Sequence, residues 1–382
     1  MSSLLTRPFL AVLLAQTSFS FAFSSYFLLP KFVTTELGAG PSAVGLVMAS
    51  FGATSIFAIP LVGAAIDRLG RRPFMTAGAL VMLAASLGFL AVDRAGPLLY
   101  ALRMVQGIAF AMTFISASTL ATDLAPEDRL GQALGIFGVS MLAMHAIAPA
   151  IAEPVAERWG WDAVFAMAAA GAAVCAGLTL LVQEPKPAPK PDGAASLVQV
   201  ALRPRSLRIF LVVALTGAAF GAMMTYPQPF ALEQGRSQVR GFFMAYAGAA
   251  IAIRLLLGGV ADRWGRHRVS LGSLAAYAAV VLAMSQLVPW ALEPLGLLFG
   301  AAHGLFYPAL NALAVEAAAP DERGKVMALF NGGFNVGNSG ATLALGFVAE
   351  RAGYASVFWI AGAGVVVALI LLAASPEGRG AD

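Results

Sequence analysis

Four side chains that carry or exchange charge lie within long apolar stretches of this sequence: Arg103, His145, Arg254 and His303. An arginine in such a stretch is costly unless it is paired or faces a polar cavity, so it marks a functional site by default. Histidine titrates near neutrality and can therefore bind or release a proton under physiological gradients. These residues suggest ion and proton handling inside an apolar environment.

Arg103 stands in the pattern Arg103-x-x-Gln106-Gly107. One interpretation is that it binds a substrate or takes part in proton transfer. The other is structural: its guanidinium joins neighbouring helix carbonyls together with Gln106. Arg254 lies near the end of its apolar stretch, eight residues before Asp262. We expect it to extend its charge to the interface or to join a gate.

His145 lies four residues before Pro149, whose ring would kink a helix and could form a hinge. The rise of a helix puts Arg103 and His145 at the same depth, about 9–10 Å below one membrane boundary. A guanidinium disfavours a protonated imidazole nearby, and a bound anion relieves that effect. We therefore predict that proton binding at His145 and substrate binding at Arg103 are linked. The alternative is a hydrogen-bonded packing histidine.

His303 is bracketed by Gly300 and Gly304, which allow another helix to approach closely. Its imidazole then either bonds across that contact or faces a cavity. Three asparagines further along the chain share one helix face: Asn331, Asn335 and Asn338. Such amides either line a cavity or hold neighbouring helices together by hydrogen bonds, and we expect Asn335 to line a cavity.

Polar residues also mark the first and seventh apolar stretches. Gln16 belongs to a polar stripe in the first, and Tyr226 lies near the end of the seventh. Both are further candidates for substrate contact. Met141, Met144 and His145 share a helix face, and thioether and imidazole ligands suit Cu(I). Methionine more often packs, so a copper site is an alternative interpretation.

The elements that carry these residues must be membrane helices. The chain has 382 residues, of which 59% are hydrophobic and 12% charged, and its mean hydropathy is +0.80. That composition excludes a soluble domain and predicts an all-α polytopic membrane protein. Twelve spans of suitable length follow, at residues 8–30, 42–66, 74–92, 97–119, 131–152, 161–182, 207–231, 239–261, 269–288, 292–315, 325–349 and 354–374.

The basic residues predict the orientation of these spans. Sixteen of the 24 lie in loops on the side of the two termini, six lie in the opposite loops, and two lie within spans. The positive-inside rule then places both termini in the cytoplasm of a bacterial-type inner membrane. No basic face with interleaved aromatic residues exists, which excludes nucleic acid as a partner.

The two halves of the chain resemble each other. Three segments recur in order at offsets of 195, 194 and 193 residues: Gly63–Arg72 with Gly258–His267, Ala125–Arg129 with Ala319–Arg323, and Ala156–Phe165 with Ala349–Phe358. We therefore predict two parallel six-helix bundles, residues 1–182 and 207–382, of the kind found in transporters. The proline-rich segment 183–206 between them is expected to be an extended, solvated linker.

On these motifs the chain resembles the major facilitator superfamily, specifically its twelve-helix drug and metabolite proton antiporters. The segment from Gly63 to Arg72 resembles the signature loop of that family, and Arg103-x-x-Gln106-Gly107 resembles its intramembrane arginine motif. The resemblance implies a loop network that closes the cytoplasmic side, formed by Gly63, Asp67, Arg68, Gly70, Arg71, Asp262 and Arg263.

The glycines of that loop are expected to let helix and loop approach a neighbouring backbone. In contrast, the span around Pro149 lacks several of the glycines that the antiporter motif carries. No Asp or Glu lies in the middle third of any predicted span. A desolvated cation needs a counter-charge, so the substrate is expected to be neutral or anionic.

The sequence thus predicts a monomeric, proton-coupled exporter of a small organic molecule that works by alternating access, without a cofactor. Alternatives are an importer of a sugar, amino acid or organic acid, and a copper transporter. An enzyme is not expected, because no nucleophile elbow or phosphate-binding loop is present.

Overall fold

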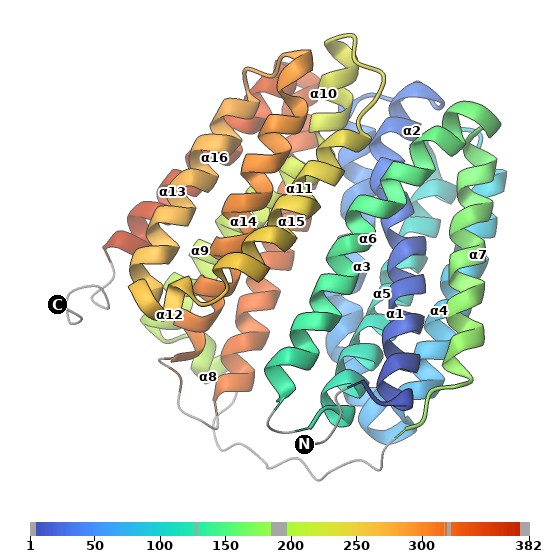
Figure 1. The fold of residues 1–382 in the computed structure, drawn as a ribbon. Helices are drawn as coiled ribbons and strands as arrows, with labels where there is room; N and C mark the ends of the chain where they lie inside the picture. The colour runs from blue at the N-terminus through green and yellow to red at the C-terminus, as the bar shows by residue number, and fades with distance from the viewer. Residues whose placement is uncertain (1–4, 127–128, 185–196, 317, 319–321, 375–382) are drawn as a thin grey trace. The chain divides into compact units, whose positions relative to one another are not determined.

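Helices make up every regular element of the described part of the computed structural model, as predicted (Figure 1). The structure describes residues 5–126, 129–184, 197–316, 318 and 322–374. The side chains of Asp67 and Asp262 lie outside this description, although their backbones belong to helices.

The chain divides into two compact units, which are treated separately below. One comprises residues 1–39 and 46–189, and the other comprises residues 40–45 and 190–382. The first contains α1 Arg7–Ser25, η1 Tyr26–Leu28, α2 Leu29–Thr35, most of α3 Pro41–Leu69, α4 Arg71–Gly88, η2 Phe89–Ala91, α5 Pro97–Leu124, α6 Leu130–Trp159 and α7 Trp161–Thr179.

The second unit contains the remaining helices. They are α8 Leu197–Ala201, α9 Pro204–Thr225, α10 Pro227–Glu233, α11 Arg240–Leu257, α12 Val260–Trp264, α13 Arg266–Met284, η4 Pro289–Ala291, α14 Leu292–Glu316, α15 Arg323–Ala352 and α16 Tyr354–Ala373.

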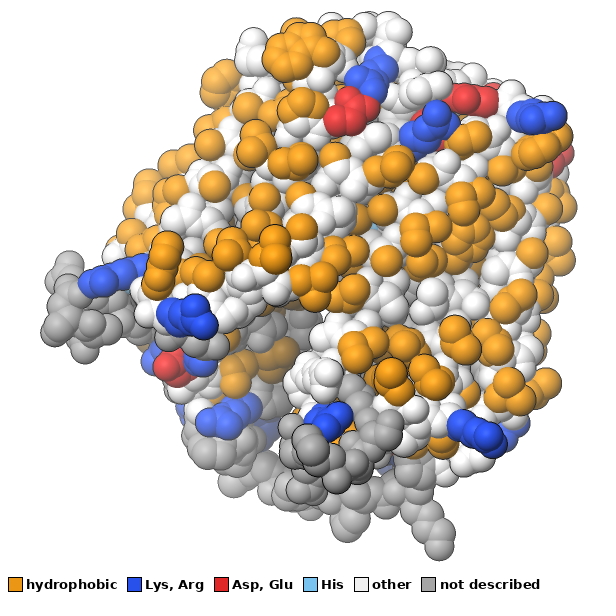
Figure 2. Space-filling view, viewed as in Figure 1, with side chains coloured by type: hydrophobic (Ala, Val, Ile, Leu, Met, Phe, Trp, Pro, Cys, Tyr) orange, Lys and Arg blue, Asp and Glu red, His pale blue; other side chains and the backbone are white. Residues whose placement is uncertain are grey.

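Eleven helices, or runs of adjoining helices, among the described residues are long and apolar enough to cross a membrane. The remaining predicted span, 325–349, forms the 30-residue helix α15, whose asparagines and glycines lower its hydropathy. Large apolar side chains such as Phe57, Leu61 and Leu256 are more than 70% exposed. Figure 2 shows apolar side chains along the middle of the helices and charged ones near their ends. This pattern suits a surface that faces lipid.

A helix break near one end of the first span positions several polar residues. Pro30 has no N–H to donate to the carbonyl of Tyr26, so the N–H of Leu29 bonds that carbonyl instead. The result is the 3₁₀ turn η1 between α1 and α2. A similar break separates α9 from α10, where Pro227 begins the second helix.

Backbone geometry repeats between the two halves of the chain. Within the described residues six glycines have positive φ angles, and they form three pairs: Gly38 with Gly235, Gly70 with Gly265, and Gly160 with Gly353. Members of a pair are 197, 195 and 193 residues apart. Residues that carry a Cβ atom rarely adopt a positive φ angle, so both halves need glycine at the corresponding turns.

Several boundaries differ from the sequence-based expectation, and three of the differences affect charged residues or the linker. Helix α6 continues to Trp159, seven residues beyond the predicted end at 152, since Pro149 and Pro154 bend a helix without ending it. Lys31 follows the predicted first span, 8–30, and is one of the six basic residues assigned to the opposite loops, but it lies on α2. The linker is not extended throughout, because its proline-free part forms α8; residues 185–196 of it lie outside the described residues.

Candidate functional site

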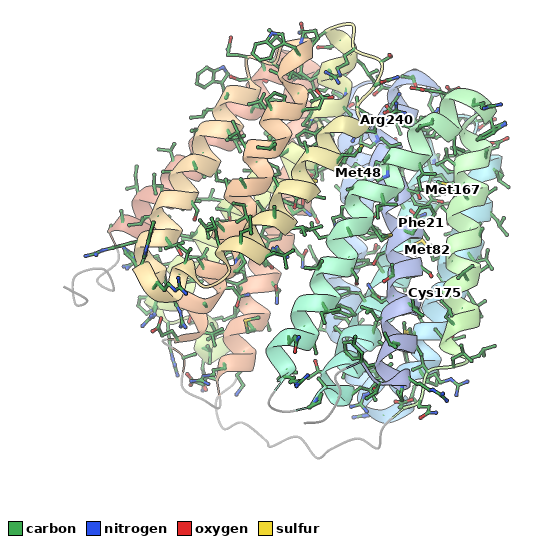
Figure 3. The ribbon with its side chains drawn as sticks, viewed as in Figure 1. Phe21, Met48, Met82, Met167, Cys175 and Arg240 are labelled. Atoms are coloured by element: carbon green, nitrogen blue, oxygen red, sulfur yellow. The ribbon has the colours of Figure 1, made fainter. Side chains whose placement is uncertain are left out.

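Arg103, on α5, is buried in an aromatic cage in the first unit. The residue is only 2% exposed, and its Nη1 donates a 2.7 Å hydrogen bond to Oε1 of Gln106. The guanidinium lies 4.8 Å from the ring centre of Phe51 and 5.9 Å from that of Tyr26. Nη2 approaches the sulfur of Met48, labelled in Figure 3, at 4.0 Å. Among the described residues, Arg103 forms no ion pair.

Three buried donor atoms of this cage have no hydrogen-bond partner within the described parts of the chain. They are Nε of Arg103, Nε2 of Gln106 and the hydroxyl of Tyr26, although the Tyr26 hydroxyl lies close enough to Ser86 and Gln106 to interact with both. Each unpaired buried donor costs about 1–3 kcal/mol. The cage therefore favours the acceptor atoms of a bound molecule or of water, and it disfavours a second cation.

Close packing of α5 against α3 builds this cage. A Cβ atom on Gly107 would lie 2.4 Å from the carbonyl oxygen of Phe51 and 2.2 Å from Oγ1 of Thr54, so only glycine fits. The hydroxyl of Thr54 also donates to the carbonyl of Met104 at 2.9 Å. The glycine of the arginine motif thus brings the ring of Phe51 against the guanidinium of Arg103.

His145, on α6, contacts the end of α1 and the turn that follows. Its Nδ1 lies 3.0 Å from the hydroxyl oxygen of Ser24, and its ring meets the ring of Phe27 edge-on at 4.6 Å. Pro149 lies one turn later inside the same helix, which continues through it. His145 is only 8% exposed, so its imidazole is largely shielded from solvent.

Arg103 and His145 approach the same stretch of the first span from different sides. The ring of Phe23 lies 5.3 Å from that of Phe51, which contacts Arg103, and 6.3 Å from the imidazole of His145. The described contacts between the two candidates therefore run through aromatic rings rather than through a direct hydrogen bond.

His303, on α14, occupies an aromatic cluster in the second unit. Its Nδ1 lies 3.1 Å from the hydroxyl of Tyr246 on α11, and its ring lies 4.9 Å from that of Phe220. The predicted close approach at the flanking glycines is confirmed. A Cβ on Gly300 would lie 2.0 Å from the carbonyl oxygen of Tyr246, and one on Gly304 would lie 2.9 Å from the Cα of Ala250.

The remaining predicted contact residues lie in different surroundings. Gln16 is fully buried and donates to Ser20 at 3.2 Å. The hydroxyl of Tyr226, also fully buried, donates to the carbonyl of Thr342 on α15. Asn335 is half-buried. Gln16 belongs to the first unit and the other two to the second, and the predicted roles of all three remain predictions.

The signature loop of the first unit carries a charge network that the motif alone did not reveal. Gly70 has a φ of +94°, and after it the backbone N–H groups of Arg71 and Arg72 donate to Glu184 at 2.5 and 3.2 Å. Arg71 is 3% exposed, and its guanidinium bonds Asp123 at 3.2 Å. Arg71 is therefore a buried connector between α4, α5 and the segment after α7.

The second unit repeats part of this network with other residues than expected. Arg266, which lies 195 residues after Arg71, bonds Glu316, which lies 193 residues after Asp123, at 3.3 Å. Arg263 corresponds to Arg68, and both are exposed. The repeat offset is the sequence signal that would have identified Arg266 and Glu316.

The expected close approach at Gly63 is not seen within the described residues, and its gating role remains a prediction. A Cβ on Gly63 would meet none of the described atoms within 4 Å, so this glycine makes no close backbone approach in the structure. The predicted gating contacts of Asp67 and Asp262 fall on side chains outside the described residues.

A buried ion pair was missed at the other end of the first unit. Nζ of Lys31 on α2 lies 2.6 Å from Glu153 and 3.8 Å from Glu157, both on α6. The side chain of Glu153 is fully buried. Because the predicted span ended at 152, Glu153 was assigned to a loop rather than to a helix.

The copper interpretation gains no further ligands. Among the described residues, no group of three or more His, Cys, Asp or Glu side chains is placed to hold a metal ion. Of the three predicted ligands, His145 uses Nδ1 for its contact with Ser24, whereas Met141 and Met144 are half-buried. Cys175, labelled in Figure 3, is buried on α7.

The arrangement matches known transport proteins. The family model of the Major Facilitator Superfamily matches residues 9–295 and 231–381. A chloramphenicol resistance protein of Pseudomonas aeruginosa is 29% identical over 69% of this chain, and the chain spans 64% of that relative's length. The multidrug resistance protein MdtG of Serratia proteamaculans is 27% identical over 87% of this chain and 84% of its own.

A solved structure of a point mutant of the nucleoside transporter NupG has a TM-score of 0.82 at 14% identity. The match covers 96% of this chain and 99% of that one, which shows a shared fold. With the family model matching almost the whole sequence, this multi-pass membrane protein belongs to the major facilitator superfamily and is a transporter.

Proposed function

We propose that this transporter is a proton-coupled exporter of small neutral or anionic organic molecules, with Arg103 at its substrate site. The observation that carries the proposal is the cage of Arg103. Its guanidinium has no counter-ion among the described residues, its buried Nε has no hydrogen-bond partner there, and the polar groups of Gln106 and Tyr26 lie beside it. A carbonyl, nitro or carboxylate group would satisfy these donors, whereas a cation would add repulsion.

Export, rather than import, is supported by the relatives. One is a chloramphenicol resistance protein and another a multidrug resistance protein, and resistance by a membrane transporter requires net removal of the compound. Both come from bacteria, and the excess of basic residues on the side of the termini supports an inner membrane location with cytoplasmic termini.

Proton coupling is assigned to His145. It is buried on the same aromatic framework as Arg103, and it lies one turn before Pro149, a natural bending point of α6. A proton on the imidazole and a bound acceptor group at Arg103 would then influence each other through the helix segment between them. Access to both sites alternates as the helix bundles move, and a monomer suffices for that cycle.

The test is transport by the purified protein in proteoliposomes with an imposed pH gradient. Radiolabelled chloramphenicol serves as a neutral probe and ethidium as a cationic one. The change Arg103→Gln should lower chloramphenicol transport roughly ten- to hundred-fold, because this factor corresponds to the free energy of hydrogen bonds to a charged group. The exposed Arg94 of the same unit provides the control Arg94→Gln, which should transport normally.

The same assay tests the coupling. His145→Gln should remove the response to the pH gradient while saturable transport at equal pH persists. Normal chloramphenicol transport by the folded Arg103→Gln protein would overturn the substrate site. An unchanged pH response in His145→Gln would overturn the coupling, and uptake driven in the import direction would overturn export.

A further inference from the structure

A hollow of about 640 Å³ lies on the second unit, away from the His303 cluster. Its wall comes from α12, the first turns of α13, and α14. Arg263, Trp264 and Arg268 line one part of it, and the other lining residues include Gly272 and Leu305. None of these side chains takes part in the contacts of His303 or Tyr226 described above.

The hollow runs from the helix ends into the apolar zone. Arg263 and Arg268 lie at the junction of α12 and α13, where the spans end. Gly272 is six residues into α13 and Leu305 is eleven residues before the end of α14, which correspond to about 9 Å and about 16 Å along the helices. A Cβ on Gly272 would meet no described atom within 4 Å, so the apolar part is open.

Charge and aromatic character concentrate at the mouth of the hollow. Among the residues whose side chains are described, the charged ones that line it are Arg263 and Arg268. The neighbouring Arg266 bonds Glu316 at 3.3 Å and does not line the hollow. Trp264 is 71% exposed, and exposed tryptophans at span ends typically lie at the level of lipid headgroups.

The first copy of the loop lacks this combination. Leu69 stands where the second copy has Trp264, and Pro73 stands where it has Arg268. The gating motif is common to both copies and therefore does not require Trp264 or Arg268. These two residues are additions specific to the second unit, and both line the hollow.

We propose that this hollow binds one anionic phospholipid. Arg263 and Arg268 bind the headgroup phosphate, Trp264 lies beside the headgroup, and an acyl chain follows the open groove past Gly272 towards Leu305. Basic pockets between membrane helices on the cytoplasmic side recognise anionic headgroups in this way, and the excess of basic residues predicts that this end faces the cytoplasm. The site does not depend on the proposed transport substrate.

Native mass spectrometry of the purified protein with phosphatidylglycerol or phosphatidylcholine tests the proposal. The protein should retain phosphatidylglycerol in preference to phosphatidylcholine. Arg268→Gln should weaken that retention about five-fold, the value of one arginine near an anionic surface, and Trp264→Leu, which restores the residue of the first copy, should weaken it further. The matched control is Arg323→Gln, an exposed arginine at the start of α15 that does not line the hollow.

Two further arms identify the source of the phosphate. Gly272→Leu fills the apolar groove and should weaken phosphatidylglycerol binding while the arginines stay in place. Inorganic phosphate and glycerol 3-phosphate should fail to displace the lipid. Displacement by either anion, or equal lipid retention by Arg268→Gln and Arg323→Gln, would overturn the proposal. This experiment measures the amount of bound lipid and not transport. A negative result would therefore overturn the lipid site and leave the proposed transport function to be tested separately.

Discussion

Buried charges in the first unit are stabilised in two different ways. Lys31 and Glu153 neutralise each other at 2.6 Å, and burial of both is tolerable because each supplies the other's counter-charge. Arg103 has instead a hydrogen bond to Gln106 and the faces of aromatic rings. Ring faces offset the charge of a guanidinium only in part. Arg103 can therefore still gain from a bound ligand, whereas the charge of Lys31 is already neutralised by Glu153.

Removing the charge of Glu153 should destabilise the protein strongly. Glu153→Gln leaves the buried ammonium of Lys31 without this carboxylate, a change that costs about 3–5 kcal/mol in comparable sites. The melting temperature of the variant in detergent should be clearly lower than that of the parent protein. Glu157, which is 42% exposed and 3.8 Å from Lys31, provides the control Glu157→Gln, with an expected cost of at most about 1 kcal/mol. Equal melting temperatures for the two variants would contradict the structural role of the pair.

At the scale of the elements, glycines decide which helices touch. Gly107 brings α5 against α3 at the arginine cage, and Gly300 brings α14 against α11 at the His303 cluster. In membranes such contacts matter more than apolar area, because lipid tails solvate apolar side chains as well as a protein core does. Both candidate clusters therefore depend on a glycine close in sequence to the candidate residue: Gly107 near Arg103, and Gly300 near His303.

Enlarging Gly300 should separate α14 from α11. In Gly300→Ala the new methyl would lie 2.0 Å from the carbonyl oxygen of Tyr246, so the helices must move apart, at a cost of about 1–3 kcal/mol. The hydrogen bond of Tyr246 to His303 should weaken with it. Thermal unfolding should show the loss, whereas Gly340→Ala, which meets no described atom within 4 Å, should show none. Equal stability of both variants would refute the packing argument.

An ion pair at the start of α15 should make the second unit sensitive to acid. Both terminal guanidinium nitrogens of Arg203, Nη1 and Nη2, donate to the carboxylate of Glu322, at 2.6 and 2.8 Å. These bonds lower the pKa of Glu322 below its ordinary value. The stabilisation is therefore fully present above the ordinary glutamate pKa, and it is lost as the pH falls through the lowered one.

Glu322→Gln tests this dependence. At neutral pH the variant should melt at a lower temperature than the parent protein. The two melting temperatures should approach each other as the pH falls below the ordinary glutamate pKa, and they should converge below the lowered pKa of Glu322, where the parent also carries a neutral carboxyl. A difference that is constant with pH would show that the ion pair does not contribute.

At the scale of the whole molecule, two copies of one architecture carry different chemistry. The turns and the arginine–carboxylate pairs recur, as Arg71 with Asp123 and Arg266 with Glu316 show. Arg103 and His145 do not recur in the second unit, whose buried candidate is His303. The scaffold is thus symmetric in sequence, whereas the proposed substrate and proton sites belong to one half.

Much of the fold followed from the sequence alone. Length and hydropathy predicted the spans, because a bilayer admits few other structures for such a chain. The repeat offsets predicted the duplication, and the motifs indicated the family. The isolated arginine and histidines were also evident, since charge is rare in these spans.

Only the tertiary structure decided which of these residues have partners. Sequence spacing along one helix does not reveal the residues that a neighbouring helix contributes, so the cage around Arg103 and the network of Arg71 with Glu184 were invisible beforehand. Glu153 was missed for the same reason: its carboxylate is tolerated in a buried helix only because α2 carries Lys31 to it. Charge placement along the chain determined the fold, and contacts between helices determined which charges remain available for a substrate.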